Sequence, residues 1–304
     1  MLCLKAHAKI NWTLDIHGTR EDGYHLMEML MQAVDMHDTL WLEEADELIL
    51  ENAVDETGAP ASEPGDAMGS EAVTYDQRNL VYKAAKLLKE RYQVSSGARM
   101  RLLKKIPSGA GMGGGSADAA ATLRGLNELW NLNLSEEELL RLGLSLGADV
   151  PFMLTGGLAH VSGIGEVIRP LFPAPEIWLV MLQPCGGLST REVFTAFDSL
   201  NPALLARPDT SKAQDALLRV DLPALGKAMN NVLEGVSAAA RPALRKAAQA
   251  LEELGAVRGM MTGSGSVVYG VFENEEKARK AAKALLPIAL SKGWGDVWVT
   301  CTVK

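Results

Sequence analysis

A glycine-rich segment near the middle of the chain carries the strongest chemical signal. Residues 109–116 read GAGMGGGS, so five glycines precede one serine. Glycines allow several backbone N–H groups to approach one anion, because no side chain obstructs it and positive φ angles are accessible. The alanine-rich segment that follows predicts a helix, whose start favours phosphate through free N–H groups and the dipole. The segment therefore predicts a nucleotide phosphate site, with Ser116 as helix N-cap or as a hydroxyl that contacts phosphate.

Other interpretations of this segment fit less well. It lacks the G-x-x-x-x-G-K-[S/T] pattern of a Walker A loop, and the chain has no H-R-D or D-F-G motif. A dinucleotide fingerprint can be placed on Gly109, Gly111 and Gly114, but the acidic residue expected ~20 positions later is missing. A flexible linker would not stand between a predicted strand and an alanine-rich helix.

Asp149 is the one charged residue in the otherwise apolar segment 147–152, GADVPF. We expect Pro151 to hold Asp149 outside helical geometry. Such an aspartate either caps the following turn or acts as a general base, and its spacing leaves both roles open.

Lys9 and Asn11 lie two positions apart in a predicted strand, so their side chains share one face. An inward lysine beside an amide is costly unless it meets an anion. The alternative is a solvent-facing pair on an edge strand, and the residues alone do not decide between the two.

Two further features carry weaker signals. Residues 261–266, MTGSGS, form a second glycine loop, which a tight hairpin explains as well as ligand contact does. Tyr24 and His25 follow a glycine turn and could stack on a planar ring, although a lone histidine is more often structural. The sequence shows neither paired carboxylates nor histidine clusters at metal-ligand spacing, so it indicates no dedicated metal site.

The elements that must position these residues mix strands with helices. Period-2 patterns and apolar runs predict strands near 4–14, 26–34, 39–50, 100–106, 177–182, 257–261, 267–272 and 297–303. Helices are expected over 79–92, from 116 onward, over 135–146, between about 190 and 255, and over 275–289. Asn79 and Ser135 are the expected N-caps of two of them, and the acidic segment 52–76 is expected to be a loop. This mixture favours an α+β fold.

Composition excludes several classes of protein. Of the 304 residues, 47% are hydrophobic and 22% are charged, as in ordinary globular chains, which excludes wholesale disorder. The net charge of -8 argues against nucleic acid or an anionic membrane as the main partner. Cys3, Cys185 and Cys301 are scattered, as is typical of reduced thiols. The N-terminus does not resemble a signal peptide and no apolar run is long enough to cross a bilayer, so we expect a cytoplasmic protein.

Taken together, these segments resemble the GHMP small-molecule kinases. The family pattern is matched in order by AKINWTL (8–14), PSGAGMGGGSADAAA (107–121) and MTGSGS (261–266). REDGYH (20–25), NLVYKAA (79–85) and GADVPF (147–152) are most similar to one branch of the family. That branch phosphorylates a cytidine-diphosphate-linked polyol on the non-mevalonate route to isoprenoid precursors. The resemblance covers about the whole chain.

The resemblance implies a two-lobed α+β fold with the active site between the lobes. A ribosomal-protein-S5-like nucleotide-binding lobe is expected over residues 1–165 and a ferredoxin-like lobe over 166–304. The implied reaction transfers a phosphoryl group from ATP to the 2-hydroxyl of the polyol, and Mg²⁺ bridges phosphate oxygens. The implied partners are ATP and the cytidine-diphosphate-linked polyol, and the chain is expected to be a monomer or a homodimer.

The resemblance also implies roles for individual residues. Asp149 would take the hydroxyl proton, and Lys9 beside it would stabilise negative charge. The implied substrate contacts are Asn11, Tyr24, His25, Thr190 and Phe194. In that set His25 would read the cytosine edge, and Thr190 and Phe194 would close over the cytidine. Lys104 is a candidate contact at the adenine or phosphate end of ATP. The ATP phosphates would be wrapped by Pro107, Ser108, Gly109, Ala110, Gly111, Met112, Gly113, Gly114, Gly115, Ser116 and Ala117.

The chain departs from the family pattern at several positions, none of which is Lys9 or Asp149. The departures are His7, Met112, Ala117 and Asn231. Two alternatives remain: another GHMP kinase of the homoserine or mevalonate type, and a non-catalytic nucleotide- or sugar-binding regulator with the same fold. DGYH and GADVPF argue against the first, and the presence of Lys9 and Asp149 argues against the second.

Overall fold

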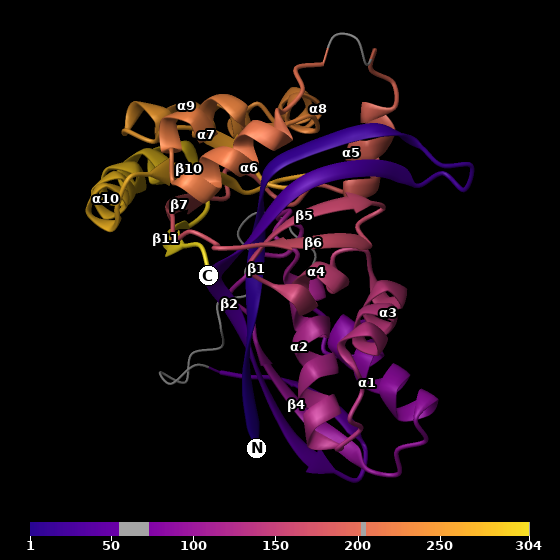
Figure 1. Cartoon of the computed structure of the whole chain (residues 1–304). Coiled ribbons are helices and arrows are strands. Elements are labelled where there is room, and N and C mark those ends of the chain that lie inside the picture. Colours follow the sequence, from indigo (N-terminus) through magenta and orange to yellow (C-terminus); the bar gives the residue numbers. More distant parts are fainter. Residues whose placement is uncertain (55–72, 202–204, 304) are drawn as a thin grey trace.

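The computed structural model describes residues 1–54, 73–201 and 205–303, whose strands form two sheets (Figure 1). The first sheet has the order β3-β4-β2-β1-β8, and β5 and β6 extend it from β2. Its strands are β1 (Leu2–Thr19), β2 (His25–Ala45), β3 (Leu48–Asn52), β4 (Gly97–Leu103), β5 (Leu158–Gly163), β6 (Val167–Leu171) and β8 (Asn230–Asn231). Most of the expected 52–76 loop lies outside the described residues.

A long antiparallel hairpin of β1 and β2 forms the centre of the first sheet. Its pairing runs from Leu2↔Leu42 to Thr19↔His25, with three register shifts. The sequence predicted two separate strands, near 26–34 and 39–50, where the structure has the single strand β2. The prediction divided it because polar residues at 35 and 37 interrupt the apolar pattern. Different halves of β2 pair with β4 and with β5, so this strand connects the whole sheet.

Three helices, α1 (Leu80–Arg91), α2 (Gly114–Leu129) and α4 (Val150–Thr155), pack against this sheet, and α3 (Glu136–Leu146) packs on these helices (Figure 1). The two predicted caps are confirmed: the Asn79 side chain accepts from the Val81 N–H, and the Ser135 hydroxyl accepts from the Glu138 N–H. Helix α2 packs closely on the sheet, and its residues Ala120 and Leu123 share a buried cluster with Leu42 of β2.

The second lobe is built on an antiparallel sheet with the order β11-β7-β10-β9. Its strands are β7 (Trp178–Leu182), β9 (Gly259–Met261), β10 (Val268–Phe272) and β11 (Val297–Cys301). The helices of this half are α5 (Thr190–Phe197), α6 (Thr210–Arg219), α7 (Leu222–Ala228), α8 (Glu234–Ala240), α9 (Ala243–Glu253) and α10 (Glu275–Lys292). Helices α9 and α10 pack on the sheet. The expected two-lobed α+β fold is confirmed.

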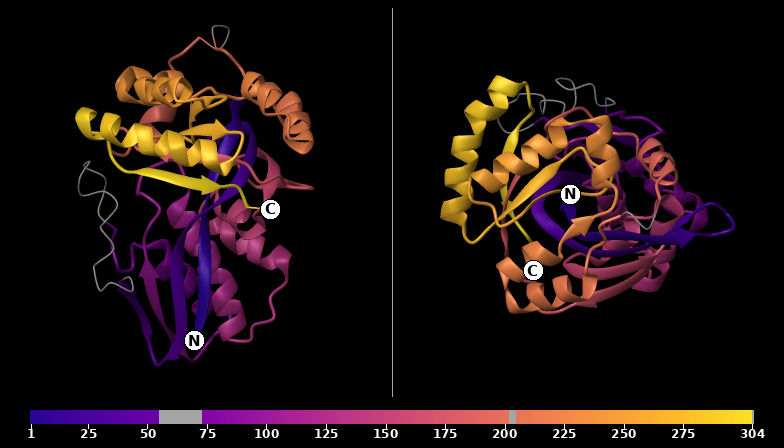
Figure 2. Two further views of the ribbon diagram at one scale, coloured as in Figure 1. Left: turned by 90° about the vertical axis from the view of Figure 1, so that its left-hand side faces the viewer. Right: turned by 90° about the horizontal axis from the view of Figure 1, so that it is seen from above.

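The change from one sheet to the other does not fall at the expected boundary of 165/166. That boundary would cut the β5–β6 hairpin, in which Leu158 pairs with Leu171 inside the first sheet. The change instead lies between Leu171 and Trp178. Figure 2 shows the second lobe stacked on one end of the first. The lobes also share backbone pairing, because β8 pairs with β1 and Val34 forms a bridge with Thr302.

None of the described helices combines the length and the apolar character that crossing a membrane requires.

Candidate active site

A hollow of about 620 Å³ lies where the two lobes meet. It is bordered by β1, the tip of the β1–β2 hairpin, the glycine segment before α2, the start of α4, α5 and the loop after β9. Most of the predicted site residues line it: Lys9, Asn11, Tyr24, His25, Lys104, Pro107, Ser108, Gly109, Ala110, Gly111, Gly113, Gly114, Gly115, Ser116, Asp149, Thr190 and Phe194. Residues from distant parts of the sequence therefore share one cavity.

Two predicted phosphate contacts, Met112 and Ala117, do not line this hollow. Their side chains are buried in the hydrophobic core, because the chain turns them away from the cavity at these positions. The Met112 carbonyl accepts a hydrogen bond of 3.1 Å from the Lys9 backbone N–H, so this residue connects the glycine segment to β1.

The helix after the glycine segment begins earlier than the sequence indicated. Gly113 is the N-cap residue, with a left-handed φ of 69°, and α2 starts at Gly114. Ser116 is therefore inside the first turn and is not the N-cap. By helix geometry the first N–H groups of α2 have no intrahelical acceptor, and Gly114, Gly115 and Ser116 all line the hollow. The result is an anion site with a serine hydroxyl beside it.

The two glycine loops pack against each other. A Cβ atom on Gly111 would lie 2.2 Å from the Thr262 carbonyl oxygen, and one on Gly263 would lie 2.7 Å from the Gly111 oxygen. Both glycines have positive φ angles. The second loop also connects β9 to β10, so it is both a hairpin connection and a wall of the hollow, to which Gly263 and Ser264 contribute.

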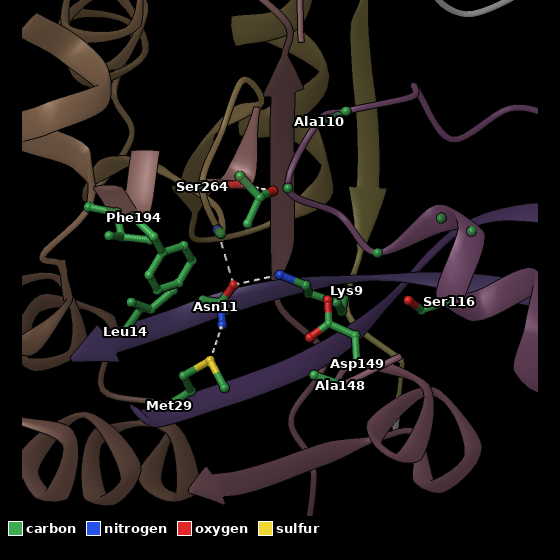
Figure 3. Close-up of a pocket in the computed structure, with 18 of the residues that line it drawn as sticks. Lys9, Asn11, Leu14, Met29, Ala110, Ser116, Ala148, Asp149, Phe194 and Ser264 are labelled. Carbon is green, nitrogen blue, oxygen red and sulfur yellow. Dashed lines mark hydrogen bonds between the residues drawn. The ribbon is translucent and has the colours of Figure 1, made fainter. Parts of the chain in front are cut away.

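Lys9 and Asn11 are buried, with 4% and 0% of their surface exposed, so the solvent-facing alternative is wrong. The Lys9 ammonium donates a 2.7 Å hydrogen bond to the Asn11 side-chain oxygen. The same oxygen accepts from the Gly263 N–H at 3.1 Å. Asn11 thus connects the buried cation to the second lobe (Figure 3).

Asp149 occupies the position before α4 with right-handed helical angles, φ −81° and ψ −17°. The expectation that Pro151 excludes this geometry is wrong, because a proline restricts the residue directly before it, which is Val150. The Asp149 side chain makes no capping hydrogen bond, so the cap role is wrong as well. The carboxylate instead lines the hollow.

Lys9 and Asp149 flank the same glycine. A Cβ atom built on Gly113 would lie 3.5 Å from Lys9 Cγ and 3.7 Å from Asp149 Oδ2. Burial lowers the pKa of Lys9, and the charge of Asp149 partly offsets that effect. Figure 3 shows both side chains between the glycine segment and Asn11. A cation and a carboxylate therefore lie directly beside the predicted phosphate site.

Lys104 lies at the other end of the phosphate site, in a buried group with two carboxylates. Its ammonium donates to Asp38 and, at 2.7 Å, to Asp118 Oδ2. Asp38 also accepts from the Ile106 N–H at 2.8 Å, which draws residues 104–106 out of the predicted strand. Burial alone would lower the pKa of Lys104, but the charges of Asp118 and Asp38 outweigh it and raise that pKa.

Neither carboxylate of this group was predicted from the sequence. Asp118 carried a signal, since it is the one acid within the alanine run of α2, whereas Asp38 had none. Burial and the nearby Asp38 charge raise the pKa of Asp118 to about 8, against the opposing effect of Lys104. Its second oxygen, Oδ1, is buried without a hydrogen-bond partner among the described residues.

A second hollow of about 570 Å³ adjoins the first. The two share Leu80, Lys104, Ser108, Gly109 and Gly115. The second is also lined by Asn79, Asp118 and Glu192. The glycine segment thus separates two adjacent cavities.

The far end of the first hollow holds aromatic groups. The His25 and Phe194 rings lie 4.8 Å apart between centroids, tilted by 39°. His25 Nε2 lies 2.6 Å from Asp198 Oδ1, a partner that is 173 positions away and that the sequence did not indicate. Tyr24 is exposed at the hairpin turn, and the Thr190 hydroxyl lies 2.9 Å from the Ser264 hydroxyl.

Comparison with protein families finds two matches. Residues 79–157 match the GHMP kinases N terminal domain, and residues 213–291 match the GHMP kinases C terminal domain. The chain is also similar to proteins named 4-diphosphocytidyl-2-C-methyl-D-erythritol kinase. That of Alkaliphilus metalliredigens is 37% identical over 282 residues, which are 93% of this chain and 91% of that protein. That of Bacillus velezensis is 40% identical over 281 residues, 92% of this chain and 91% of the relative.

Comparison with solved structures gives the same result. A crystal structure of 4-(cytidine 5'-diphospho)-2C-methyl-D-erythritol kinase superposes with a TM-score of 0.80 and 31% identity, covering 100% of both chains. Homoserine kinase from Cytophaga hutchinsonii has a TM-score of 0.71 and 19% identity, covering 98% of this chain and 94% of its own, so it supports the fold alone.

Proposed function

The chain belongs to the GHMP kinases and, among them, to the 4-diphosphocytidyl-2-C-methyl-D-erythritol kinases, and on that premise we propose how its residues carry out the reaction. It is an enzyme that uses ATP to phosphorylate this cytidine-diphosphate-linked polyol. The observation that carries the mechanism is the buried Lys9 beside Asp149 at Gly113, where the phosphate site begins.

The triphosphate of ATP binds along the glycine segment. Support comes from the free N–H groups at the start of α2 and from Gly111 and Gly113, whose positive φ angles bring the backbone to the cavity surface. The adenosine part occupies the second hollow, which continues from the same glycines past Asn79 and Leu80. Lys104 then acts mainly to hold this end of the site in place, because its ammonium is already bound by the Asp38 and Asp118 side chains.

The acceptor hydroxyl lies between Asp149 and the terminal phosphate. Its oxygen forms a bond to the γ-phosphorus while the bond from that phosphorus to the β–γ bridging oxygen breaks and ADP leaves. The hydroxyl proton passes to the Asp149 carboxylate, which is free for this role because it caps nothing. The Lys9 ammonium lies where negative charge develops on the phosphate oxygens. Phosphoryl transfer depends mostly on such positioning and charge neutralisation.

The cytidyl end of the substrate binds at the aromatic end of the hollow. His25 and Phe194 offer ring faces to the base, and Tyr24 lies next to His25 at the rim. Asp198 holds Nε2 of His25, which leaves Nδ1 to meet the base edge. We assign transfer to the 2-hydroxyl of the erythritol, which in this proposal lies toward Lys9 and Asp149.

Mg²⁺ would accompany the ATP phosphates. It prefers oxygen ligands and keeps most of its contacts with phosphate and water. The Ser116 hydroxyl and the Asp149 carboxylate are oxygen donors that line the hollow, so the residues present fit such an ion. When bound, Mg²⁺ neutralises charge on the phosphate oxygens.

Release of ADP with a panel of acceptors tests this function. The expected result is turnover with 4-diphosphocytidyl-2-C-methyl-D-erythritol and little with homoserine or mevalonate. Faster turnover with homoserine or mevalonate would show that the chain belongs to another branch of the family. Binding of ATP without turnover of any acceptor would indicate a non-catalytic protein.

A further inference from the structure

Three side chains that could ligate a metal meet outside the active site. His7 of β1 and Asp35 and His37 of β2 each offer a donor atom, and these atoms all lie within 4.8 Å of one another. None of the three lines the active-site hollow. The sequence alone did not indicate this group, because His7 and His37 are 30 positions apart and only strand pairing brings them together.

The backbone of the β1–β2 hairpin defines this group. His7 and His37 are direct cross-strand partners, and Asp35 lies two residues before His37 on the same strand. The register shifts between His7 and Lys9, so β2 has extra residues around position 35. Such an irregularity can re-aim a side chain, and here the Asp35 carboxylate comes to lie beside the histidine pair.

Both imidazole rings are already oriented by the main chain. Nδ1 of His7 lies 3.0 Å from the Val34 carbonyl oxygen, and Nδ1 of His37 lies 2.5 Å from the Asp35 carbonyl oxygen. A carbonyl oxygen only accepts, so each Nδ1 carries the hydrogen and each neutral ring keeps its lone pair on Nε2. Metal-binding histidines commonly have this support from a carbonyl on the other nitrogen.

We propose that His7, Asp35 and His37 form a Zn²⁺ site on the hairpin, beside a hollow that Asp35 and His37 line together with β11. Two imidazole nitrogens and one carboxylate oxygen are donors that suit Zn²⁺ or a similar first-row ion, with water as the fourth ligand. A tetrahedral ion with bonds of ~2.0–2.1 Å holds its donors ~3.3 Å apart. The donor atoms now lie within 4.8 Å of one another, so the side chains must rotate to bring them to that spacing.

The neighbours of the site allow these rotations. The ligands are exposed or only half-buried. Lys5 competes for Asp35, because its ammonium lies 3.9 Å from that carboxylate in an ion pair that is more than half exposed at both ends. Such a pair contributes little stability and yields to a metal ion. Met36, between the two β2 ligands, donates to the Thr300 hydroxyl near the end of β11. A bound ion would therefore stabilise the place where the first lobe meets the last strand.

Titration of the full chain with Zn²⁺ in the absence of nucleotide tests the proposal. One ion per chain is expected to bind, with an increase in melting temperature. His37→Asn, which keeps a side chain of similar size, should weaken the affinity by at least about tenfold and remove the thermal shift. Asp35→Asn should weaken binding in the same direction.

Two matched variants complete the experiment. His17→Ala removes another accessible histidine, whose Nε2 is held by Glu28 at 3.0 Å, and Cys3→Ser removes an exposed thiol. Both are expected to bind Zn²⁺ as the unchanged chain does. Absence of Zn²⁺ binding in the unchanged chain, or equal affinity in His37→Asn, would overturn the proposal. A loss with His17→Ala or Cys3→Ser as large as with His37→Asn would do so as well.

Discussion

The Lys9 ammonium lies 2.7 Å from the Asn11 side-chain oxygen, and this contact fixes the direction of a buried cation. Asn11 is in turn held by the Gly263 N–H of the second lobe. The position of the charge that we assign to catalysis therefore depends on how the two lobes meet.

Replacing Lys9 by methionine keeps the length of the side chain and removes its charge. We expect kcat to fall by roughly 10²–10³, the usual effect of losing one group that stabilises transition-state charge. Lys5→Met, on the same strand but exposed, should leave kcat unchanged. Steady-state kinetics on folded protein makes the comparison, and equal kcat values for the two variants would exclude Lys9 from the chemistry.

Gly111→Ala should impair both stability and ATP binding. The left-handed backbone alone costs a non-glycine residue about 1–2 kcal/mol, and the added Cβ would also meet the Thr262 carbonyl oxygen. Gly18→Ala is the matched variant, because its Cβ would meet nothing within 4 Å. Urea unfolding and the KM for ATP measure the two effects. If both variants retain the same stability, the two glycine loops are not packed as described.

His25→Ala should weaken the cytidyl substrate and spare ATP. Loss of a stacked base contact is worth about 1–3 kcal/mol, or roughly a 5- to 150-fold higher KM. Asp198→Asn should raise the same KM by less, because the ring remains and only its orientation is relaxed. A rise in the KM for ATP of equal size would instead indicate that His25 supports the fold.

The buried Asp118 makes stability depend on pH. Its pKa is raised to about 8 in the folded chain, against about 3.9 for an unfolded aspartate. A raised carboxyl pKa contributes stability that is complete below the unfolded value and is lost as pH rises through the folded value. The free energy of unfolding should therefore decline between about pH 4 and pH 8, and Asp118→Asn should flatten that decline.

Urea unfolding at several pH values measures this effect. Asp215→Asn changes an exposed aspartate and should keep the pH dependence of the unchanged chain. The same slope in Asp118→Asn would show that Asp118 does not hold the proton.

Much of the fold follows from local sequence signals. The caps at Asn79 and Ser135 were predicted because their side chains accept from N–H groups two or three residues away, which a local pattern encodes. Strand β6 was not predicted because it is mostly exposed, so only its pairing with β5 assigns it to the first sheet.

Parts of the site that a single segment of sequence forms were predictable. Parts that form where distant segments meet were not. The glycine loop was recognised from a single run of residues, and motif resemblance added Lys9 and Asp149. Neither signal reveals that Asp38 meets Lys104, or that Asp198 meets His25, since the pairs are 66 and 173 positions apart. Tertiary packing alone creates these contacts.

The most direct measurement of the proposed mechanism is a single-turnover experiment on Asp149→Asn with ATP and 4-diphosphocytidyl-2-C-methyl-D-erythritol. The variant keeps the size of the side chain and cannot take a proton. We predict that phosphoryl transfer slows by about 10²–10⁴ while the affinity for ATP is unchanged. Transfer at nearly the original rate would show that Asp149 is not the base.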